Sequence, residues 1–338
     1  MQFKCKECGE SFGSRRSLHA HIKKHKLILG DYYVKYVPRF DKLTNKPIEF
    51  KNADQYLSSD FNRDGNMLRW CAEAPKDEVK EYILEKFKKR IEEKGLDKAP
   101  SSVYLKTAGL PTVEVIKRIF GSYTLFCREL GIETRYGDNL CEEFFEDYSD
   151  ATIWIDTREN QPLEFKNSFV CKLDYGDYTL EPKSYTFTHV ERKSFSDFAS
   201  TVTNGYDRFY KEMERCRHSG CYLFVVIDTD FEGIFKLNNS VYKRFNMSYV
   251  FNKMRQFEIE FGDCCQFVFS GSRERSEELI PKILCLGKKL WKVDLQYFWE
   301  KELNKNGLAR RKSEAEQEVQ GYQRRGFTTR RLYGRRRS

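Results

Sequence analysis

Three short motifs in the second half of the chain combine acidic and basic side chains that suit phosphodiester chemistry. They read IDTRE at 155–159, GDY at 176–178 and ERKSFSD at 191–197. Hydrolysis of a phosphodiester needs a divalent cation that neutralises charge on the phosphate and lowers the pKa of the attacking water. Mg²⁺ takes oxygen ligands, usually one or two carboxylates. We therefore expect a metal centre in which Asp177 and Glu191, on neighbouring strands, supply the carboxylates.

The spacing around Glu191 places a cation beside it. Side chains of a strand alternate between its faces, so Lys193 shares a face with Glu191, whereas Arg192 points the opposite way. Lys193 can then reach the same phosphate or attacking water as a metal held by Asp177 and Glu191. Each residue taken alone also has an ordinary structural account, such as a turn or an ion pair on a solvated face. The three motifs in order are harder to explain in that way.

The elements that must position these residues form an α/β pattern. From Thr152 to about Trp299, short apolar strands alternate with helices, which predicts a central mixed sheet. The expected strands lie near 152–156, 168–173, 176–181, 185–191, 221–228 and 266–270, and the expected helices at 194–218, 246–262 and 273–290.

IDTRE, GDY and ERKxxxD in this order resemble the XPF-type nuclease domain, a branch of the restriction-endonuclease-like fold. The resemblance covers roughly 150–290. It includes the helix after the ERK motif, at 196–213, and the strand YLFVVID at 222–228. It implies a DNA endonuclease that depends on Mg²⁺ or Mn²⁺ and cuts near branches or flaps, as in DNA repair or recombination. It also suggests homodimerisation through the nuclease domain, involving helix 273–290.

The resemblance assigns roles residue by residue. Asp177 and Glu191 would be metal ligands, Asp156 would complete the acidic cluster, and Lys193 would assist the nucleophile. The residues that would support the site or engage the phosphate are Arg158, Glu159, Arg192 and Asp197, and Arg208 would contact DNA. Paired helix-hairpin-helix units, common after this domain, have no counterpart after Trp299, so other regions must select the substrate. The rival interpretation is a DNA-binding or scaffold protein with an inactive nuclease fold, but all the acidic and Lys positions are present.

The N-terminal segment has the spacing of a zinc site. FKCKECGESFGSRRSLHAHIKKH places Cys5, Cys8, His21 and His25 in a C-x2-C-x12-H-x3-H pattern. A unit of 26 residues is too small to fold by hydrophobic burial, so tetrahedral Zn²⁺ must supply the folding energy. The segment resembles a two-Cys, two-His finger with a ββα fold.

The surface of this finger favours phosphate contacts. The base-reading positions of such fingers fall on Ser14, Ser17 and Ala20, none of which can make bidentate base contacts. The residues that fit phosphate contacts, which position without specifying, are Arg15, Arg16, Lys23 and Lys24. A lone finger could equally bind a protein.

The region 31–135 is mixed and mainly helical, with helical periodicity in 76–94 and 111–130. Residues 100–132 resemble a short repeat often attached to homing endonucleases. We favour DNA contact through Lys106, Lys117 and Arg118, the alternative being a plain core around the apolar positions Val115, Ile119, Phe120 and Leu125. Residues 31–99 show no chemical constellation, and their role cannot be read from the sequence.

Charge is concentrated at both ends of this chain of net charge +9. Residues 305–338 hold eleven Lys or Arg against three Glu, and residues 1–30 hold seven against two. Basic ends predict a polyanion partner, namely DNA, and a tail 305–338 that orders only on binding. The acidic stretch within 136–150 reads as a linker between this region and a nuclease domain at 151–300.

The cellular setting follows from composition. There is no membrane-length apolar run, signal peptide or disulfide framework, so we expect an intracellular protein in a reducing compartment, phage-borne or bacterial and nucleoid-associated, or nuclear if eukaryotic. The combination of modules leaves a site-targeted, homing-type nuclease and a branch- or flap-selective nuclease both open, with a slight preference for the first.

Overall fold

The computed structural model describes residues 3–40, 46–47, 70, 74–234, 245–301 and 303. The expected basic tail, 305–338, and most of 41–73 lie outside the described residues. Among those described, no helix has the length and apolar character needed to cross a membrane.

A six-stranded sheet forms the centre of the second half of the chain. Its order is β4-β3-β5-β6-β7-β8, and its strands are β3 (Thr152–Asp156), β4 (Asn167–Cys171), β5 (Tyr178–Leu180), β6 (Thr188–Lys193), β7 (Tyr222–Ile227) and β8 (Cys265–Phe269). β5 runs antiparallel to β3 and β6, whereas the β3–β4, β6–β7 and β7–β8 pairs are parallel. The predicted mixed sheet is confirmed, and each strand lies within a few residues of its expected position.

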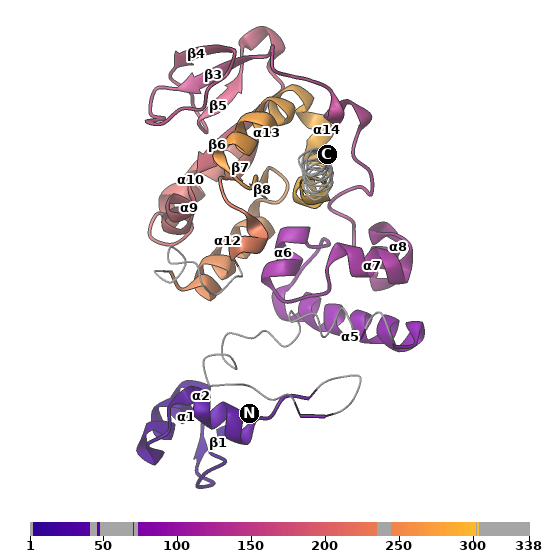
Figure 1. Ribbon diagram of the computed structural model, residues 1–338, viewed down its shortest axis with the longest axis vertical. Coiled ribbons are helices and arrows are strands. Elements are labelled where there is room, and N and C mark those ends of the chain that lie inside the picture. Colours follow the sequence, from indigo (N-terminus) through magenta and orange to yellow (C-terminus); the bar gives the residue numbers. More distant parts are fainter. Residues whose placement is uncertain are drawn as a thin grey trace, which may run out of the picture.

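Helices cover both faces of this sheet (Figure 1). The helices of the first face are α9 (Phe195–Val202), α10 (Tyr206–His218) and α12 (Met247–Phe261), and those of the second are α13 (Arg273–Leu286) and α14 (Lys288–Trp291). α11 (Phe231–Ile234) follows β7, and the short 3-10 turn η3 (Pro182–Ser184) precedes β6. Every residue of β7 is buried, as expected for a central parallel strand with helices on both sides.

Two expected helices are each divided by a local break. The helix predicted over 194–218 stops at Val202, since Thr203 leaves the helical backbone region with φ −111° and ψ −81°, and the Thr203 hydroxyl donates to the Ala199 carbonyl at 2.6 Å. The helix predicted over 273–290 stops at Gly287, which has φ +49° and ψ −117°. A Cβ there would lie 2.4 Å from the Thr186 side chain, so only glycine fits this break.

A helical unit precedes the sheet and consists of α5 (Lys76–Lys94), α6 (Ser102–Thr107), α7 (Val113–Phe120) and α8 (Tyr123–Leu130). Two carboxylates from the sheet domain, the buried Glu258 and the half-buried Asp294, bind the start of α6. Glu258 accepts from the Ser101 backbone N–H at 3.0 Å, and Asp294 accepts from the Ser102 N–H at 2.6 Å and from its hydroxyl at 2.7 Å. The helical unit and the sheet domain are therefore docked against each other through polar contacts that are partly or fully buried.

This docking changes the expected role of two lysines. Lys106 Nζ donates to Glu300 at 2.6 Å, and Lys117 lies 3.6 Å from Asp138 and 4.7 Å from the ring centre of Tyr297. Arg118 remains exposed. Lys106 and Lys117 therefore contribute to the junction, in contrast to the expected phosphate contacts, because folding brings Glu300 beside Lys106 and Tyr297 beside Lys117.

The acidic stretch expected to be a linker is packed onto the sheet domain. It contains the 3-10 turn η2 (Glu142–Phe145), whose Phe144 is buried against Trp299. Lys282 donates to the carbonyls of Phe144 and Glu146, each at 2.9 Å. Burial of Phe144 outweighs the acidity of its neighbours, so this segment is not a free hinge in the structure.

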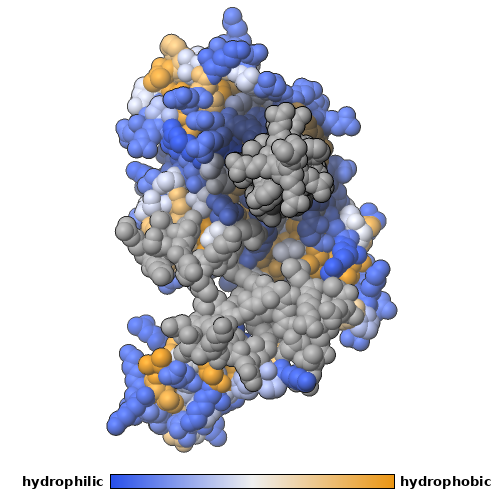
Figure 2. Space-filling view, viewed as in Figure 1, coloured by the Kyte–Doolittle hydropathy of each residue, from blue (hydrophilic) through white to orange (hydrophobic). Residues whose placement is uncertain are grey.

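The N-terminal unit begins with a hairpin of β1 (Phe3–Lys4) and β2 (Ser11–Phe12), followed by α1 (Arg15–Ile22), the 3-10 turn η1 (Lys23–His25) and α2 (Leu29–Tyr36). The two strands and α1 have the expected ββα order, and η1 continues from α1. Figure 2 shows a mainly hydrophilic surface with hydrophobic residues gathered near β3–β5, where Phe169 and Val170 of the edge strand β4 are exposed.

Candidate functional site

Three acidic residues of the motifs lie in one row across the sheet. The register pairs Ile155 with Tyr178, and Tyr178 with Val190, in antiparallel ladders. The next positions along these ladders place Asp156 beside Asp177 and Asp177 beside Glu191. The row lies at the end of β3, the start of β5 and the second half of β6.

Strand alternation places the key side chains on one face. Tyr178 and Val190 point into the core under α13, so Asp177 and Glu191 point toward the side covered by α9 and α10. Lys193 follows Glu191 on that face, and its Nζ donates to Glu191 Oε1 at 2.6 Å. Asp177, Glu191 and Lys193 therefore share one face and one edge of the sheet.

Gly176 makes the approach of β5 to β6 possible. It has φ +60°, and a Cβ at this position would lie 2.8 Å from the Val190 carbonyl oxygen. The next residue, Asp177, is fixed at both ends. Its N–H donates to that carbonyl at 2.8 Å, and its Oδ2 accepts from the Arg192 N–H at 2.8 Å. The glycine of the GDY motif is thus required by packing as well as by backbone conformation.

Asp177 and Glu191 have too little positive charge near them to keep both carboxylates ionised. Burial raises the pKa of Asp177 to about 8, and the negative charge of Glu191 adds to the effect. Burial also raises the pKa of Glu191, although Lys193 opposes the shift. For Lys193, burial lowers the pKa, but the charge and hydrogen bond of Glu191 outweigh it and raise the pKa overall. A divalent cation would supply the missing charge, so this donor set fits Mg²⁺ or Mn²⁺.

Asp156 has different partners from those expected. Its carboxylate accepts from the Arg158 Nε at 2.6 Å, from the Arg158 backbone N–H at 2.7 Å and from the Leu173 N–H at 2.6 Å. Burial opposes the charged form of Asp156, but these hydrogen bonds outweigh it and lower the pKa. The carboxylate is therefore turned toward Arg158, and it anchors the chain after β4.

The three carboxylates of the row do not converge on one point. Within the described part of the chain, the one set of three or more Cys, His, Asp or Glu side chains whose donor atoms lie within 4.8 Å of one another is in the N-terminal unit. Asp177 and Glu191 are neighbours across the β5–β6 ladder on one face of the sheet and are called the Asp177–Glu191 pair below, whereas the Asp156 carboxylate is held by Arg158 and the Leu173 N–H.

Arg192 faces the opposite side of the sheet, as expected from alternation. Its Nη1 lies 2.5 Å from Asp228 Oδ2. Its Nη2 lies 3.4 Å from Glu159 Oε1 and donates to the Gln161 carbonyl at 2.9 Å. Burial opposes the charge of Arg192, but Asp228 outweighs it and raises the pKa. Arg192 and Glu159 thus form an ion-pair network behind the row of acids, and Asp228 is a member that sequence reasoning missed.

The remaining residues of the ERK segment lie at the surface. Asp197 accepts from the Ser194 hydroxyl at 2.6 Å, and Ser194 in turn accepts from the Asp197 N–H at 3.2 Å. This reciprocal pair caps the start of α9. Arg208 is exposed on α10. Neither residue contacts the Asp177–Glu191 pair through a hydrogen bond found in the described residues.

Glu212 of α10 is a carboxylate that sequence reasoning missed. Its Oε1 lies 3.4 Å from the Gly176 N–H, which it faces as an acceptor. Besides burial, the negative charge of Glu212 helps to raise the pKa of Glu191. The signal was its place beside Met213 at the edge of the buried stripe of α10, where helical spacing directs a side chain toward the sheet.

The N-terminal unit brings its four expected metal ligands together. Cys8 Sγ lies 3.1 Å from His21 Nε2, Cys5 Sγ lies 3.6 Å from His25 Nε2, and the two Nε2 atoms are 2.9 Å apart. Ligand bond lengths of Zn²⁺ in a tetrahedron give separations of about 3.3–3.6 Å between such donor atoms, so two of the three pairs are closer together than in a metal-bound site. The four donor atoms nevertheless converge within 4.8 Å of one another, and two thiols with two imidazoles are a donor set that fits Zn²⁺.

The helix of this unit exposes the residues expected to face DNA. Ser14, Ser17 and Ala20 are all exposed, although the Ser14 hydroxyl also caps α1 by accepting from the Ser17 N–H at 3.1 Å. The four basic residues of this helix and of η1 are exposed as well, namely Arg15, Arg16, Lys23 and Lys24.

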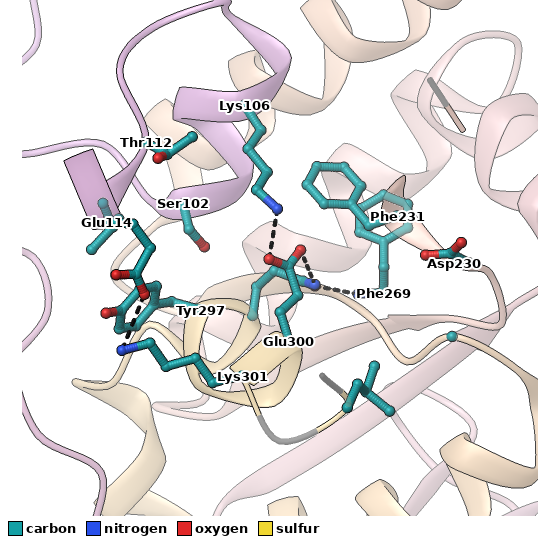
Figure 3. A pocket seen from close by; sticks show the side chains of 14 residues that line it. Ser102, Lys106, Thr112, Glu114, Asp230, Phe231, Phe269, Tyr297, Glu300 and Lys301 are labelled. Atoms are coloured by element: carbon teal, nitrogen blue, oxygen red, sulfur yellow. Dashed lines mark hydrogen bonds and ion pairs between the residues drawn. The ribbon is translucent and has the colours of Figure 1, made fainter. Parts of the chain in front are cut away.

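A cavity of about 410 Å³ lies at the junction of the helical unit and the sheet domain, away from the row of acids. Figure 3 shows Lys106 directed toward Glu300, and Lys301 toward Glu114, at distances of 2.6 and 3.1 Å. None of its lining residues belongs to the three motifs. The cavity therefore belongs to the domain junction and is separate from the candidate centre.

The ERCC4 domain family matches residues 147–283. XPF from Aeropyrum pernix aligns with 17% identity over 40% of this chain and 66% of that one, with a TM-score of 0.31. XPF from the same organism in complex with DNA aligns with 19% identity over 41% of this chain and 66% of that one, with a TM-score of 0.32. Comparison with curated proteins gave no match. The sheet domain described above, with all six of its strands and its row of acids, thus lies within the part of the chain that is similar to the ERCC4 domain family, and this chain spans just under two thirds of the XPF chains it aligns with.

Proposed function

We propose that this chain is a DNA endonuclease that hydrolyses phosphodiester bonds with the help of Mg²⁺ or Mn²⁺. The observation that carries the proposal is the shared face of Asp177, Glu191 and Lys193 at one edge of the sheet, in a region matched by the ERCC4 domain family. The side chains of Glu191 and Lys193 are each only 12% exposed. Charged groups gain catalytic strength in such a partly dry environment.

The residues of the centre would have different roles. Asp177 and Glu191 would hold the cation, which supplies positive charge for the phosphate and a water of lowered pKa. Lys193 donates hydrogen bonds, so it can bind a phosphate oxygen or orient the attacking water. Asp156 orients Arg158, whose side chain is 63% exposed and can reach a phosphate from the same edge. Arg192, Glu159 and Asp197 stabilise the strand and helix that carry these groups.

Substrate binding would use the N-terminal unit. We propose that Zn²⁺ bound by Cys5, Cys8, His21 and His25 holds this unit folded, and that its exposed basic residues contact phosphates. Affinity for DNA should then fall steeply with added salt.

The choice between site-targeted and branch-selective cleavage is tested by parallel digestion of a long duplex and of flap and fork substrates with Mg²⁺ or EDTA. Discrete duplex fragments indicate site targeting, and cuts confined to junctions indicate branch selectivity. DNA binding without cleavage of either substrate would contradict the proposed activity and favour an inactive, DNA-binding nuclease fold.

Homodimerisation through the nuclease domain remains a proposal. The expected surface, α13, already buries its apolar residues against its own sheet, including Leu279, Ile280 and Ile283. A dimer through α13 would therefore have to use the exposed face of this helix, which carries charged residues such as Glu274 and Glu278, and light scattering of the purified chain measures whether a dimer forms.

Glu212 provides a sharper test of the centre. Glu212→Gln removes a negative charge beside Glu191 while nearly preserving shape, so we expect weaker binding of Mn²⁺ by the DNA-free protein and cleavage reduced about tenfold. The matched control is Glu214→Gln, an exposed Glu on the same helix. Equal Mn²⁺ binding and equal cleavage by the two variants would exclude Glu212 from the centre.

A further inference from the structure

Helix α2, which follows the zinc-binding segment, packs against it as part of one small core. Tyr32 is 2% exposed and is buried together with Cys5, Leu18 and Ile22. The chain reaches this position through Lys26, which has φ +58° and ends η1 in a left-handed conformation. The sequence pattern of the finger ends at His25, so nothing in that pattern accounts for this helix.

The contacts of α2 concentrate on the turn between the two cysteines. The Tyr32 hydroxyl accepts from the Lys6 N–H at 2.8 Å. Lys6 Nζ donates to the Tyr36 carbonyl at 2.9 Å, and Lys35 Nζ donates to Glu7 at 3.2 Å. Lys6 and Glu7 are the two residues between Cys5 and Cys8, so α2 is joined to this turn by three hydrogen bonds.

Tyr32 and Cys5 are buried in the same small cluster, so the hydrogen bond from the Lys6 N–H to the Tyr32 hydroxyl lies next to an expected metal ligand. Outer hydrogen bonds of this kind orient metal ligands and set how tightly the metal is held. Burial of the phenol ring fixes the hydroxyl in place, so the bond does not depend on an exposed and mobile side chain.

We infer that the metal-binding unit extends from residue 3 to residue 36 and that Tyr32 is a positioning residue of its metal site. Its hydroxyl accepts from the Lys6 N–H and so holds the Cys5–Cys8 turn in the conformation that binds the metal. This inference rests on the zinc binding proposed above. It predicts that a single oxygen atom, contributed from outside the Cys/His pattern, controls retention of the metal.

The neighbouring Tyr33 provides a matched control. Its hydroxyl forms a 2.8 Å hydrogen bond with His19 Nε2, and the two rings meet edge to face at 5.8 Å. His19 is not among the four converging ligands. Tyr33→Phe therefore removes the same atom from the same helix without touching the Cys5–Cys8 turn.

The experiment compares the full chain with Tyr32→Phe and Tyr33→Phe, each purified with Zn²⁺. Bound zinc is measured with a colorimetric chelator, and affinity by competition with a chelator of known strength. We expect Tyr32→Phe to bind Zn²⁺ about 10- to 100-fold more weakly than the wild type. Tyr33→Phe should stay close to the wild type. With Co²⁺ in place of zinc, the thiolate-to-metal absorption should weaken or shift in Tyr32→Phe alone.

The outcomes separate the two proposals. A wild-type chain that binds no zinc contradicts the proposed metal site itself. A wild-type chain that binds zinc, together with equal affinity in both variants, overturns the role of Tyr32 and leaves the metal site standing. Loss of zinc from both variants to the same extent also overturns it, because the effect would then belong to the packing of α2 as a whole.

Discussion

Asp177→Asn and Glu191→Gln proteins are expected to lose Mg²⁺-dependent DNA cleavage by about a thousandfold, equivalent to about 4 kcal/mol of transition-state stabilisation. Each substitution keeps the shape of the side chain and removes one negative charge from the pair that would hold the cation. Cleavage is measured as nicking of a supercoiled plasmid under single-turnover conditions, with Mg²⁺ or EDTA.

The same substitutions should leave the fold intact. Burial raises the pKa of Asp177 to about 8 and also raises that of Glu191, so the metal-free protein already disfavours their charged forms. A neutral amide is therefore compatible with position 177, and thermal unfolding of Asp177→Asn without metal should be unchanged or shifted upward, whereas Glu191→Gln removes the ion-pair partner of Lys193 and should unfold at a somewhat lower temperature. Glu214→Gln serves as the exposed control and should cut as the wild type does. Equal nicking by the wild type and both variants would point to a contaminating nuclease and remove the basis for the proposed enzyme.

Cys8→Ser should produce the second large effect, a loss of zinc from the N-terminal unit. Structural zinc sites of this size contribute about 10–16 kcal/mol of apparent binding free energy, which is also their folding free energy. The hydrophobic cluster of this unit, made of Cys5, Leu18, Ile22 and Tyr32, is too small to replace that contribution. We expect zinc content to fall from about one ion per chain to nearly none, and hydrogen exchange across residues 3–36 to become fast.

The sheet domain should be unaffected, because its two hydrophobic clusters share no residue with that of the N-terminal unit. Cys171→Ser makes the same substitution in β4 and should keep its zinc. If Cys8→Ser retained zinc as well as Cys171→Ser does, the assignment of Cys8 as a ligand would be wrong.

The arrangement of the motif residues could be predicted because it depends on local rules. Alternation along β6 places Glu191 and Lys193 together and sends Arg192 to the other face, whatever the rest of the fold does. The Cys/His spacing likewise predicts four converging donors. In both places the information lies within a few residues of sequence.

The features that could not be predicted depend on contacts between distant segments. The Asp156 carboxylate accepts a hydrogen bond from the Leu173 N–H, seventeen residues later, and no local sequence pattern predicts this contact. The sequence around Lys106 favours a phosphate contact, but in the fold its ammonium group donates to Glu300, 194 residues later. Helical spacing places Glu212 at the edge of the buried stripe of α10, but the sequence does not show which strand that edge faces, and only the docking of α10 brings Glu212 to the Gly176 N–H.

The packed acidic stretch has a practical consequence for fragment design. A truncated protein cut to the family match, 147–283, would lack Phe144 and would also lack Trp299, its partner in the core. It would leave Glu258 buried without the Ser101 N–H that it accepts from in the whole chain. Such a fragment should aggregate or unfold on expression, whereas a fragment beginning before α5 and ending after the helix at 295–301 keeps every one of these contacts.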